Sequence, residues 1–418
     1  MANKQDIQTL KGFRDFLGAE MRQRLWLIGE IRQTFERFGF EPLESPVLEY
    51  EALLAGKYGA EADKLMYRFE DRGGRRVAMR YDQTVPAARI IAQYQGQLTF
   101  PYRKYQIQLA WRADKPQKGR YREFLQCDAD IIGSSSPIAD ADILGVYSAI
   151  YQNIGLTSLK INLNDRAQLI QSIQNSGVTE AMIFPVIQTV DKLDKKGAEA
   201  VIQELTEKGL SADIAKSVLD NLGKSQPTDN LKRIIELATK LGVPDGVLQF
   251  NPNLARGLDY YTGMIFEGVI PEYEVGAVGG GGRYDELINK LVGADYPAVG
   301  FGLGFDRTLE VAVQLGKVPA MKSNSTVLIT MASPEILDDS LRITQQLRQS
   351  GIAAETITEG NLPLEKQLKY ADRKGIPYVI IVSPEELKNN RVLLKNMQSG
   401  DQESLTIEAI SAKLLHEH

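Results

Sequence analysis

The stretch AWRADKPQKGRYREFLQCDADIIG, Ala110 to Gly133, decides the fold of this chain. Its second half and the preceding segment, 102–111, both alternate between polar and apolar residues, so they predict two antiparallel strands joined by a polar loop. One face of this hairpin is apolar. The other carries arginine, glutamine and aspartate, and in the second strand it comprises Arg122, Phe124, Gln126, Asp128 and Asp130.

The polar face of the hairpin has two interpretations. It is either the solvated side of an antiparallel sheet or a binding surface. The loop between the strands adds Lys115, Lys118 and Arg120 next to carboxylates, and guanidinium groups bind phosphate oxygens bidentately. Such a face suits a nucleoside triphosphate together with a polar second substrate.

The rest of the chain predicts an α+β fold in two domains. The first, 1–322, combines an antiparallel sheet with a helical insertion at about 170–245, where the apolar residues recur with helical spacing. The second, 325–418, alternates strands and helices, which predicts a small α/β domain with a largely parallel sheet. Residues 66–81 predict a further hairpin around DRGG.

Composition restricts the chemistry. The only histidines of the sequence, His416 and His418, lie at the end of the chain, so neither a Ser-His-Asp triad nor a histidine-ligated metal site is expected in the body. Carboxylates, arginines, tyrosines and backbone dipoles must act instead, and no residue is predicted to bind a metal. The net charge of −5 argues against indiscriminate nucleic-acid binding.

The same sequence predicts a cytoplasmic protein. It has no unbroken apolar run of membrane length and a polar start, MANKQDIQTL, so we expect neither a membrane span nor a secretory signal. The single cysteine, Cys127, excludes an internal disulfide framework and suits a reducing compartment.

Three further segments are candidates for a site. PAVGFGLGFDRTLEVAVQLG, 297–316, predicts a strand and a glycine-spaced turn before a helix whose first turn favours anions. VGGGGRYDEL, 278–287, is either a loop of close approach or a flexible turn. RGLDYYTGMIFE, 256–267, is either a packed turn leading into a strand or part of the site.

Together these segments resemble the class II aminoacyl-tRNA synthetases and, within them, the histidyl-tRNA synthetases. FEPLESPVLE resembles the first class II motif at the dimer interface, WRADKPQKGRYREF the second and GFGLGFDR the third. RGLDYYTG and GGGGRYDEL resemble the two segments peculiar to the histidine enzymes. KGFRDFLG and LEKQLKYADRKGIPYVIIV also match, so the resemblance covers nearly the whole chain.

The resemblance implies a homodimeric ligase that uses ATP and Mg²⁺ to activate L-histidine and then transfers it to its tRNA. Its C-terminal domain would bind the anticodon, with Lys366, Lys369, Arg373 and Lys374 available for phosphates. One alternative is a non-catalytic regulatory relative that senses histidine or RNA, although such relatives typically lose RGLDYYTG or the tail. Another is a different ATP-dependent ligase on the same fold.

The resemblance also assigns roles to individual residues. Arg112 and Arg256 would hold the α-phosphate from opposite sides as catalytic residues. ATP would further contact Asp114, Arg120 and Arg307. Histidine would be bound by Asp82, Gln83, Thr84, Gln126, Asp130, Tyr260 and Tyr261. Of these, Asp82, Thr84 and Gln126 would receive its amino group, and Asp130 and Tyr261 would contact its imidazole, with Tyr260 beside them. Many relatives have glutamate where this chain has Asp114 and Asp130.

These roles agree with the scarcity of histidine. The carboxylate of an amino acid is already ionised at neutral pH, so its attack on a phosphate needs no general base. The attack requires alignment and stabilisation of charge on the phosphorus oxygens, which arginines provide.

Overall fold

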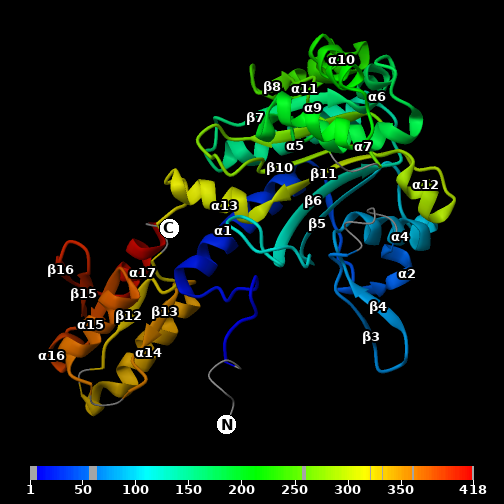
Figure 1. Ribbon diagram of the computed structural model, residues 1–418. Coiled ribbons are helices and arrows are strands. Elements are labelled where there is room, and N and C mark those ends of the chain that lie inside the picture. Colours follow the sequence, from blue (N-terminus) through cyan, green and yellow to red (C-terminus); the bar gives the residue numbers. More distant parts are fainter. Residues whose placement is uncertain are drawn as a thin grey trace. The chain divides into compact units, whose positions relative to one another are not determined.

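The computed structural model describes residues 7–55, 64–256, 260–320, 322–331, 333–359 and 362–416. They form two compact units (Figure 1). The first comprises Met1–Asp15 and Arg24–Val318, and the second Phe16–Gln23 and Pro319–His418. Helix α1 (Gly18–Arg37) contributes residues to both units. Among the described residues no helix is both long and apolar enough to cross a membrane.

An eight-stranded sheet forms the centre of the first unit, in the order β1-β5-β6-β11-β10-β9-β7-β8. Neighbouring strands are antiparallel except in the pairs β1–β5 and β7–β8. The predicted α+β class with an antiparallel sheet is therefore confirmed. The strands are β1 (Glu41–Pro42), β5 (Tyr102–Trp111), β6 (Glu123–Ile132), β7 (Lys160–Asp165), β8 (Leu248–Phe250), β9 (Met264–Val269), β10 (Gly279–Arg283) and β11 (Ala298–Gly304).

The apolar face of this sheet packs against helices. Cys127, Ala129 and Ile131 of β6 lie in one buried cluster with Tyr147 and Tyr151, which are completely inaccessible. Burial of such a face against helices is the main source of stability for a layered fold. The helices that contribute are α1, α5 (Pro137–Asn153), α11 (Asp229–Lys240) and α13 (Phe305–Gln314).

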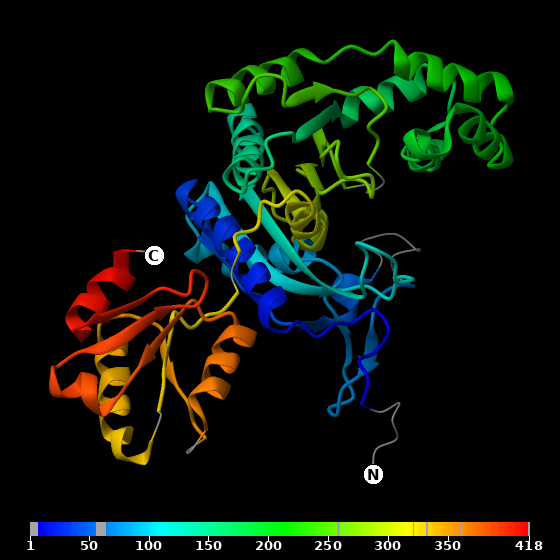
Figure 2. The ribbon, with the colours of Figure 1, turned by 90° about the vertical axis from the view of Figure 1, so that its left-hand side faces the viewer.

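The helical stretch predicted as an insertion divides between two cores. Its first helices form a buried cluster of their own around Leu169, Val186 and Val218. Helix α11 instead buries Leu231 and Ile234 in the main core. The helices with the separate core are α6 (Arg166–Gln174), α7 (Glu180–Val190), α8 (Leu193–Lys196), α9 (Ala198–Glu207) and α10 (Ala212–Gly223); we call them the helical module. Figure 2 shows this part of the chain, in green, grouped at one end of the unit.

Glu204 in the helical module gives a pH-dependent stability. Hydrogen bonds from Lys192 and Lys196, with Lys208 also close, lower its pKa from 4.5 to about 2. Because the pKa of Glu204 is lower in the folded chain than in the unfolded chain, its ionised form stabilises the fold at pH values above about 4.5. This contribution is lost as the pH falls from about 4.5 to about 2. We expect Glu204→Gln to remove this part of the acid sensitivity in circular-dichroism melts. Equal acid sensitivity in both proteins would contradict the assignment.

A small three-stranded sheet, three short helices and a 3₁₀ turn complete the described part of the first unit. The hairpin predicted at 66–81 is confirmed as β3 and β4, with β2 on the other side of β4. Helix α4 follows, and Asp82 Oδ1 accepts from the backbone nitrogens of Thr84 and Val85 at its start. The bounds are β2 (Leu48–Tyr50), α2 (Glu51–Leu54), β3 (Arg68–Glu70), β4 (Arg76–Met79), α4 (Thr84–Tyr94), a 3₁₀ turn at Gln95–Gln97 and α12 (Leu287–Val292).

The second unit is an α/β domain whose sheet is mixed rather than largely parallel. Strands β13, β12 and β14 are parallel, but β15 and β16 add an antiparallel hairpin. The sequence interpretation missed this hairpin because its strands are short and partly exposed. The elements are β12 (Val327–Ile329), a 3₁₀ turn at Pro334–Ile336, α14 (Leu337–Gln349), β13 (Ala354–Thr356), α15 (Leu364–Lys374), β14 (Tyr378–Ile381), α16 (Pro384–Lys388), β15 (Val392–Asn396), β16 (Gln402–Leu405) and α17 (Ile407–His416).

Candidate active site

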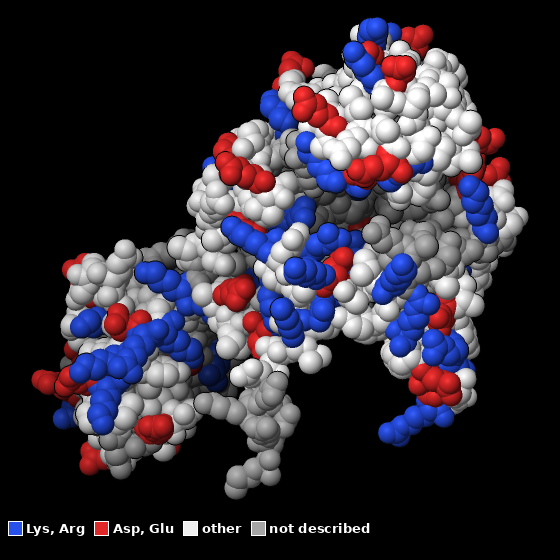
Figure 3. All heavy atoms as spheres, viewed as in Figure 1, with Lys and Arg blue, Asp and Glu red and all other residues white. Residues whose placement is uncertain are grey.

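The polar face of the large sheet is the floor of a cavity of about 390 Å³. Figure 3 shows Lys and Arg side chains gathered around a hollow on this side of the first unit. With the exception of Gln83, all the site residues predicted from the sequence line the cavity. They are Asp82, Thr84, Arg112, Asp114, Arg120, Gln126, Asp130, Arg256, Tyr260, Tyr261 and Arg307.

Glycines keep the floor of the cavity open. On β11, Gly302 pairs with Asp128 of β6 and Gly300 pairs with Asp130, and β10 continues both rows with further glycines. A Cβ atom at Gly300 would lie 1.8 Å from Asp130 Oδ1, and one at Gly280 would lie 2.4 Å from Arg256 Nη1. The GGGG segment is therefore a strand beneath functional side chains, neither a loop nor a flexible turn.

For the adenylate-forming reaction that the sequence resemblance implies, we expect Gly280→Ala to lower the rate at least about tenfold, because misplacing a group in an active site by about 1 Å is costly. The guanidinium end of Arg256 can move, but the carbonyl oxygen of Phe266, also 2.4 Å from the added Cβ, is backbone. Gly29→Ala on α1 is the matched control, since no atom lies within 4 Å of its Cβ position. Single-turnover rates equal to wild type for Gly280→Ala would contradict the close approach.

The polar face is buried, so its interpretation as a solvated surface is wrong. Lys104 of β5 is completely inaccessible and pairs with Asp130 at 2.5 Å. Its ammonium also donates to Gln106 Oε1 at 2.8 Å, and Gln106 donates to Gln108 at 2.9 Å. Buried polar groups are satisfied by such networks. This network fixes the carboxylate of Asp130 at the cavity floor.

Tyr284 holds the other oxygen of Asp130. Its hydroxyl donates to Asp130 Oδ1, and burial, together with the neighbouring Asp130, raises the pKa of Tyr284 well above its ordinary value. The tyrosine therefore remains a donor at neutral pH. Tyr260 packs against Tyr284 and Tyr261, with ring centroids 5.9 and 4.7 Å apart, so three tyrosines surround this end of the cavity.

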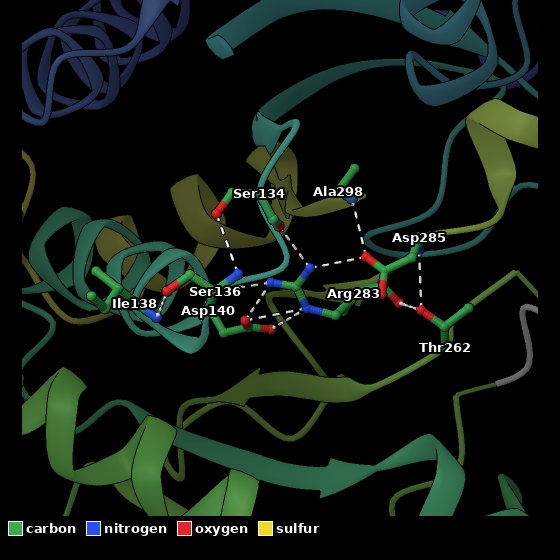
Figure 4. Close-up of polar contacts among 8 residues, drawn as sticks. All are labelled: Ser134, Ser136, Ile138, Asp140, Thr262, Arg283, Asp285 and Ala298. Carbon is green, nitrogen blue, oxygen red and sulfur yellow. Dashed lines mark hydrogen bonds and ion pairs between the residues drawn. The ribbon is translucent and has the colours of Figure 1, made fainter. Parts of the chain in front are cut away.

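A buried ion pair fixes the strand end that carries Tyr284. Arg283 Nε donates to Asp140 Oδ1 at 3.0 Å, and a second nitrogen also contacts Asp140. The remaining donors reach Ser134 O and Asp285 Oδ1, both at 2.9 Å. Figure 4 shows the guanidinium enclosed by these groups. Because Asp285 N also donates to Thr262 Oγ1 at 3.1 Å, the same cluster connects β10 to the segment that follows Tyr261.

Arg112 lies at the end of β5, facing the cavity. Its guanidinium stacks between aromatic rings, 4.4 Å from the centroid of Tyr81 and 5.2 Å from that of Phe124. Nε donates to Tyr81 O at 3.0 Å. The planar group is thus held at its faces and at one nitrogen, an orientation in which an arginine can present its other donors to an anion.

Two more arginines of the cavity contact the loop between β5 and β6. Arg120 forms an ion pair with Asp114 at 3.0 Å. Arg307, in the first turn of α13, donates to Ala277 O at 2.7 Å and to Gly119 O at 3.2 Å. Arg112, Arg120 and Arg307 thus bring three arginines from different segments to the cavity.

Arg256 reaches the cavity from a different segment. Its backbone has a φ of 33°, in the left-handed region that non-glycine residues rarely adopt. Nη1 lies 3.7 Å from Glu267 Oε1, and the guanidinium lies 5.9 Å from the Tyr261 ring centroid. Gly257, the glycine at which the sequence suggests a bend behind Arg256, lies outside the described residues.

The structure does not support direct histidine binding by Gln83. Its side chain is completely inaccessible and does not line the cavity. Nε2 donates to Gln108 O and to Gln126 O, both at 2.9 Å. The amide therefore joins β5 and β6 beneath the site, which supports the floor rather than contacting a ligand.

Four residues of the site were not assigned from the sequence: Lys104, Asp128, Glu267 and Tyr284. Lys104 and Asp128 occupy alternating positions on the polar face of β5 and β6. This two-residue alternation could have identified both of them from the sequence. Tyr284 follows the glycine strand directly. Glu267 gave no signal, because its position beside Arg256 depends on the pairing of β9 with β10.

The antiparallel sheet with its cationic, glycine-floored cavity is the catalytic architecture of a class II aminoacyl-tRNA synthetase. Residues 12–308 match the family model described as histidyl-tRNA synthetase, and residues 326–417 match the anticodon binding domain. The chain belongs to the histidyl-tRNA synthetase family.

Individual relatives agree with this assignment. The chain is 37% identical to the histidine–tRNA ligase of Rhodopirellula baltica over 97% of this chain and 98% of that protein. It is 35% identical to the histidine–tRNA ligase of Christiangramia forsetii over 99% of this chain and 100% of that protein. The crystal structure of histidyl-tRNA synthetase from a Nostoc species matches with a TM-score of 0.85 at 28% identity, over 99% of both chains. The predicted function and enzyme class, an ATP-dependent aminoacyl-tRNA ligase for histidine, are confirmed at the level of the family.

Proposed function

We propose that the chain activates L-histidine with ATP, releasing pyrophosphate, and then transfers histidine from the adenylate to the 3′ end of its tRNA. The observation that carries this proposal is the convergence of Arg112 and Arg256, from separate segments, on the cavity that also holds the fixed carboxylate of Asp130. The cavity is therefore lined both by arginines that can bind a phosphate and by a carboxylate that can accept a hydrogen bond from an imidazole N–H.

In the first step the carboxylate of histidine attacks the α-phosphate. Arg112 and Arg256 bind that phosphate from opposite sides and stabilise the charge that develops on its oxygens. The histidine carboxylate needs no base, because it is ionised at neutral pH. Asp114 lies beside the adenine, while Arg120 and Arg307 bind the outer phosphates.

Selection of the amino acid occurs at the other end of the cavity. Asp82, Thr84 and Gln126 receive the amino group, and Asp130 accepts a hydrogen bond from the imidazole. Tyr260 and Tyr261 enclose the ring. A neutral imidazole offers one donor and one acceptor, and a site built on hydrogen bonds rejects apolar analogues strongly.

Mg²⁺ enters this reaction with ATP. The ion usually keeps several waters and is held by phosphates and one or two carboxylates, and Glu267, which lines the cavity, is the carboxylate suited to it. Among the described residues there is no group of three side chains that would form a metal site by themselves. When bound, Mg²⁺ neutralises charge on the phosphates.

We divide the chain into a catalytic domain, 1–322, with a helical insertion at about 170–245, and an anticodon-binding domain, 325–418. On α15 of the second domain Lys369 and Lys374 form ion pairs with glutamates. Lys366 and Arg373 are also exposed, which leaves them suited to phosphates of histidine tRNA.

Replacing both Lys366 and Arg373 with alanine is expected to weaken tRNA charging several-fold, because each phosphate contact adds to affinity at physiological salt. Pyrophosphate exchange measures activation without tRNA and stays at the wild-type rate. The exposed pair Lys232 and Lys240, on α11 of the other unit, serves as the control. Equal charging by wild type and the α15 variant would remove these two residues from the tRNA surface.

We propose that the enzyme is a cytoplasmic homodimer. Val47 and Leu48, in the segment that resembles the first class II motif, are each 41% exposed and apolar, as expected for a surface covered by a second copy. Sedimentation velocity tests this directly: a single species of twice the chain mass supports it, and a monomer at micromolar concentration rejects it.

Pyrophosphate exchange into ATP, measured with each of the twenty amino acids, tests the activity. Exchange with histidine alone is expected. Exchange with another amino acid would indicate a different ligase, and no exchange with any would indicate a regulatory protein.

A further inference from the structure

Two neighbouring acceptor atoms at the cavity floor have no hydrogen-bond donor. Gln126 Oε1 and Asp128 Oδ1 are both buried and unpartnered. Both residues lie on the polar face of β6 and line the cavity. The other ends of the two side chains are joined, since Gln126 Nε2 donates to Asp128 Oδ2 at 2.7 Å. The pair thus has two acceptor oxygens at the cavity floor that lack a donor.

Such an arrangement is costly unless a donor arrives. A buried polar group without a hydrogen-bond partner is destabilising, and more so when it is charged. Asp128 is only 4% exposed, and burial, reinforced by Asp130 and Asp82 against the opposing effect of Lys104, raises the pKa of its carboxyl group well above the ordinary value. A carboxylate at this position is therefore unfavourable without a positively charged partner.

The charges around Asp128 favour a cation as the missing donor. Asp82 and Asp130 contribute negative charge, while Lys104, the cation that faces them from β5, is already engaged with Asp130 and Gln106. A primary ammonium carries three N–H donors and no acceptor. It can satisfy Gln126 Oε1 and Asp128 Oδ1 together and still donate once more.

We propose that Asp128 binds the ammonium group of the substrate amino acid directly, beside Gln126. This inference rests on the proposed function and extends it by one binding residue. The ammonium lies over Asp128 and Gln126, two and four positions before Asp130 on the same strand face, so the amino acid extends along β6 with its side chain toward Asp130. Gly302 leaves the space, since a Cβ there would lie 3.1 Å from Asp128 Oδ1.

Asp128→Asn tests the proposal, because asparagine keeps the shape and can still accept from Gln126 but loses the charge. We expect the KM for histidine in pyrophosphate exchange to rise by about 10–100-fold, as for loss of a charge-assisted hydrogen bond. The KM for ATP stays unchanged. Asp142→Asn on α5, which removes a carboxylate paired with Arg103 outside the cavity, is the matched control.

Imidazolepropionate, which is histidine without its amino group, identifies the group that Asp128 contacts. Its inhibition constant is expected to be the same for wild type and Asp128→Asn. An unchanged KM for histidine, or equal weakening of histidine and imidazolepropionate, would overturn the proposal. Wild type without histidine-dependent exchange would instead refute the function itself. If Asp128→Asn does not fold, Asp128→Ser, which is smaller and also uncharged, takes its place with the same expected results.

Discussion

Replacing Arg256 with either lysine or alanine is expected to slow histidyl-adenylate formation by about 10²–10³-fold, the usual effect of losing one preorganised donor to a developing oxyanion. Histidine affinity is expected to change little, because the proposed role of Arg256 is to bind the phosphate and not the amino acid. Lysine does not rescue the rate, since an ammonium lacks the planar fork that binds two phosphate oxygens.

The surroundings of Arg256 show how this donor is preorganised. The left-handed backbone, the glycine at position 280 and the neighbouring Glu267 all restrict where the guanidinium can lie. Its Nε is buried without a hydrogen-bond partner, so a donor remains for a ligand. Backbone strain of this kind persists where the surrounding structure holds it, often at functional sites.

Single-turnover adenylate formation with folded variants measures the effect. Arg233→Ala is the matched control, because Arg233 forms an ion pair with Glu236 on the surface of α11, outside the cavity. A rate within a few-fold of wild type for Arg256→Ala would return RGLDYYTG to its interpretation as a packed turn.

Asp140→Ala is expected to lower the free energy of unfolding of the first unit by about 3 kcal/mol. Breaking a buried ion pair by removing one partner costs roughly 3–5 kcal/mol, because the other charge remains buried. The lower end applies here, since Asp285 and Ser134 continue to accept from Arg283. The Asp140 and Arg283 side chains are only 2% and 9% exposed, so water cannot readily replace the lost carboxylate.

Urea denaturation followed by tryptophan fluorescence reports on this unit, because Trp26 and Trp111 both belong to it. Asp229→Ala removes a fully exposed carboxylate from a surface pair with Lys232 and should leave the unfolding midpoint nearly unchanged. Equal unfolding midpoints and slopes for Asp140→Ala and Asp229→Ala would show that the buried pair contributes nothing.

Local patterns predicted the central part of the fold. The hairpin of β5 and β6 follows from alternation within about thirty residues, and the structure confirms both its strands and its apolar face. Residues lining the cavity came from the same alternation and from motifs that lie within single segments. The resemblance to the histidyl-tRNA synthetases then predicted that these separate segments form one site.

Long-range contacts could not be derived in this way. Lys104 has the local pattern of an ordinary strand lysine, yet it is completely inaccessible and its ammonium contacts Asp130 and Gln106. Asp306 pairs with Arg14 and Arg24, both at 2.7 Å, although almost three hundred residues separate them. Helix α11 has the same local pattern as the helical module, yet tertiary packing places it in the main core. The burial of Lys104, the ion pairs of Asp306 and the packing of α11 all depend on tertiary contacts between distant segments. The spacing of residues within one segment does not specify such contacts.

Aminoacylation of unfractionated tRNA by the full chain tests whether the cavity on the large sheet attaches histidine to tRNA. The reaction contains ATP, Mg²⁺ and all twenty amino acids, and the product is identified by nuclease digestion and mass analysis of the terminal adenosine. We expect histidyl-adenosine as the product with the wild-type chain and its near absence with Arg256→Ala. A different aminoacyl-adenosine, or none with the wild type, would contradict this function.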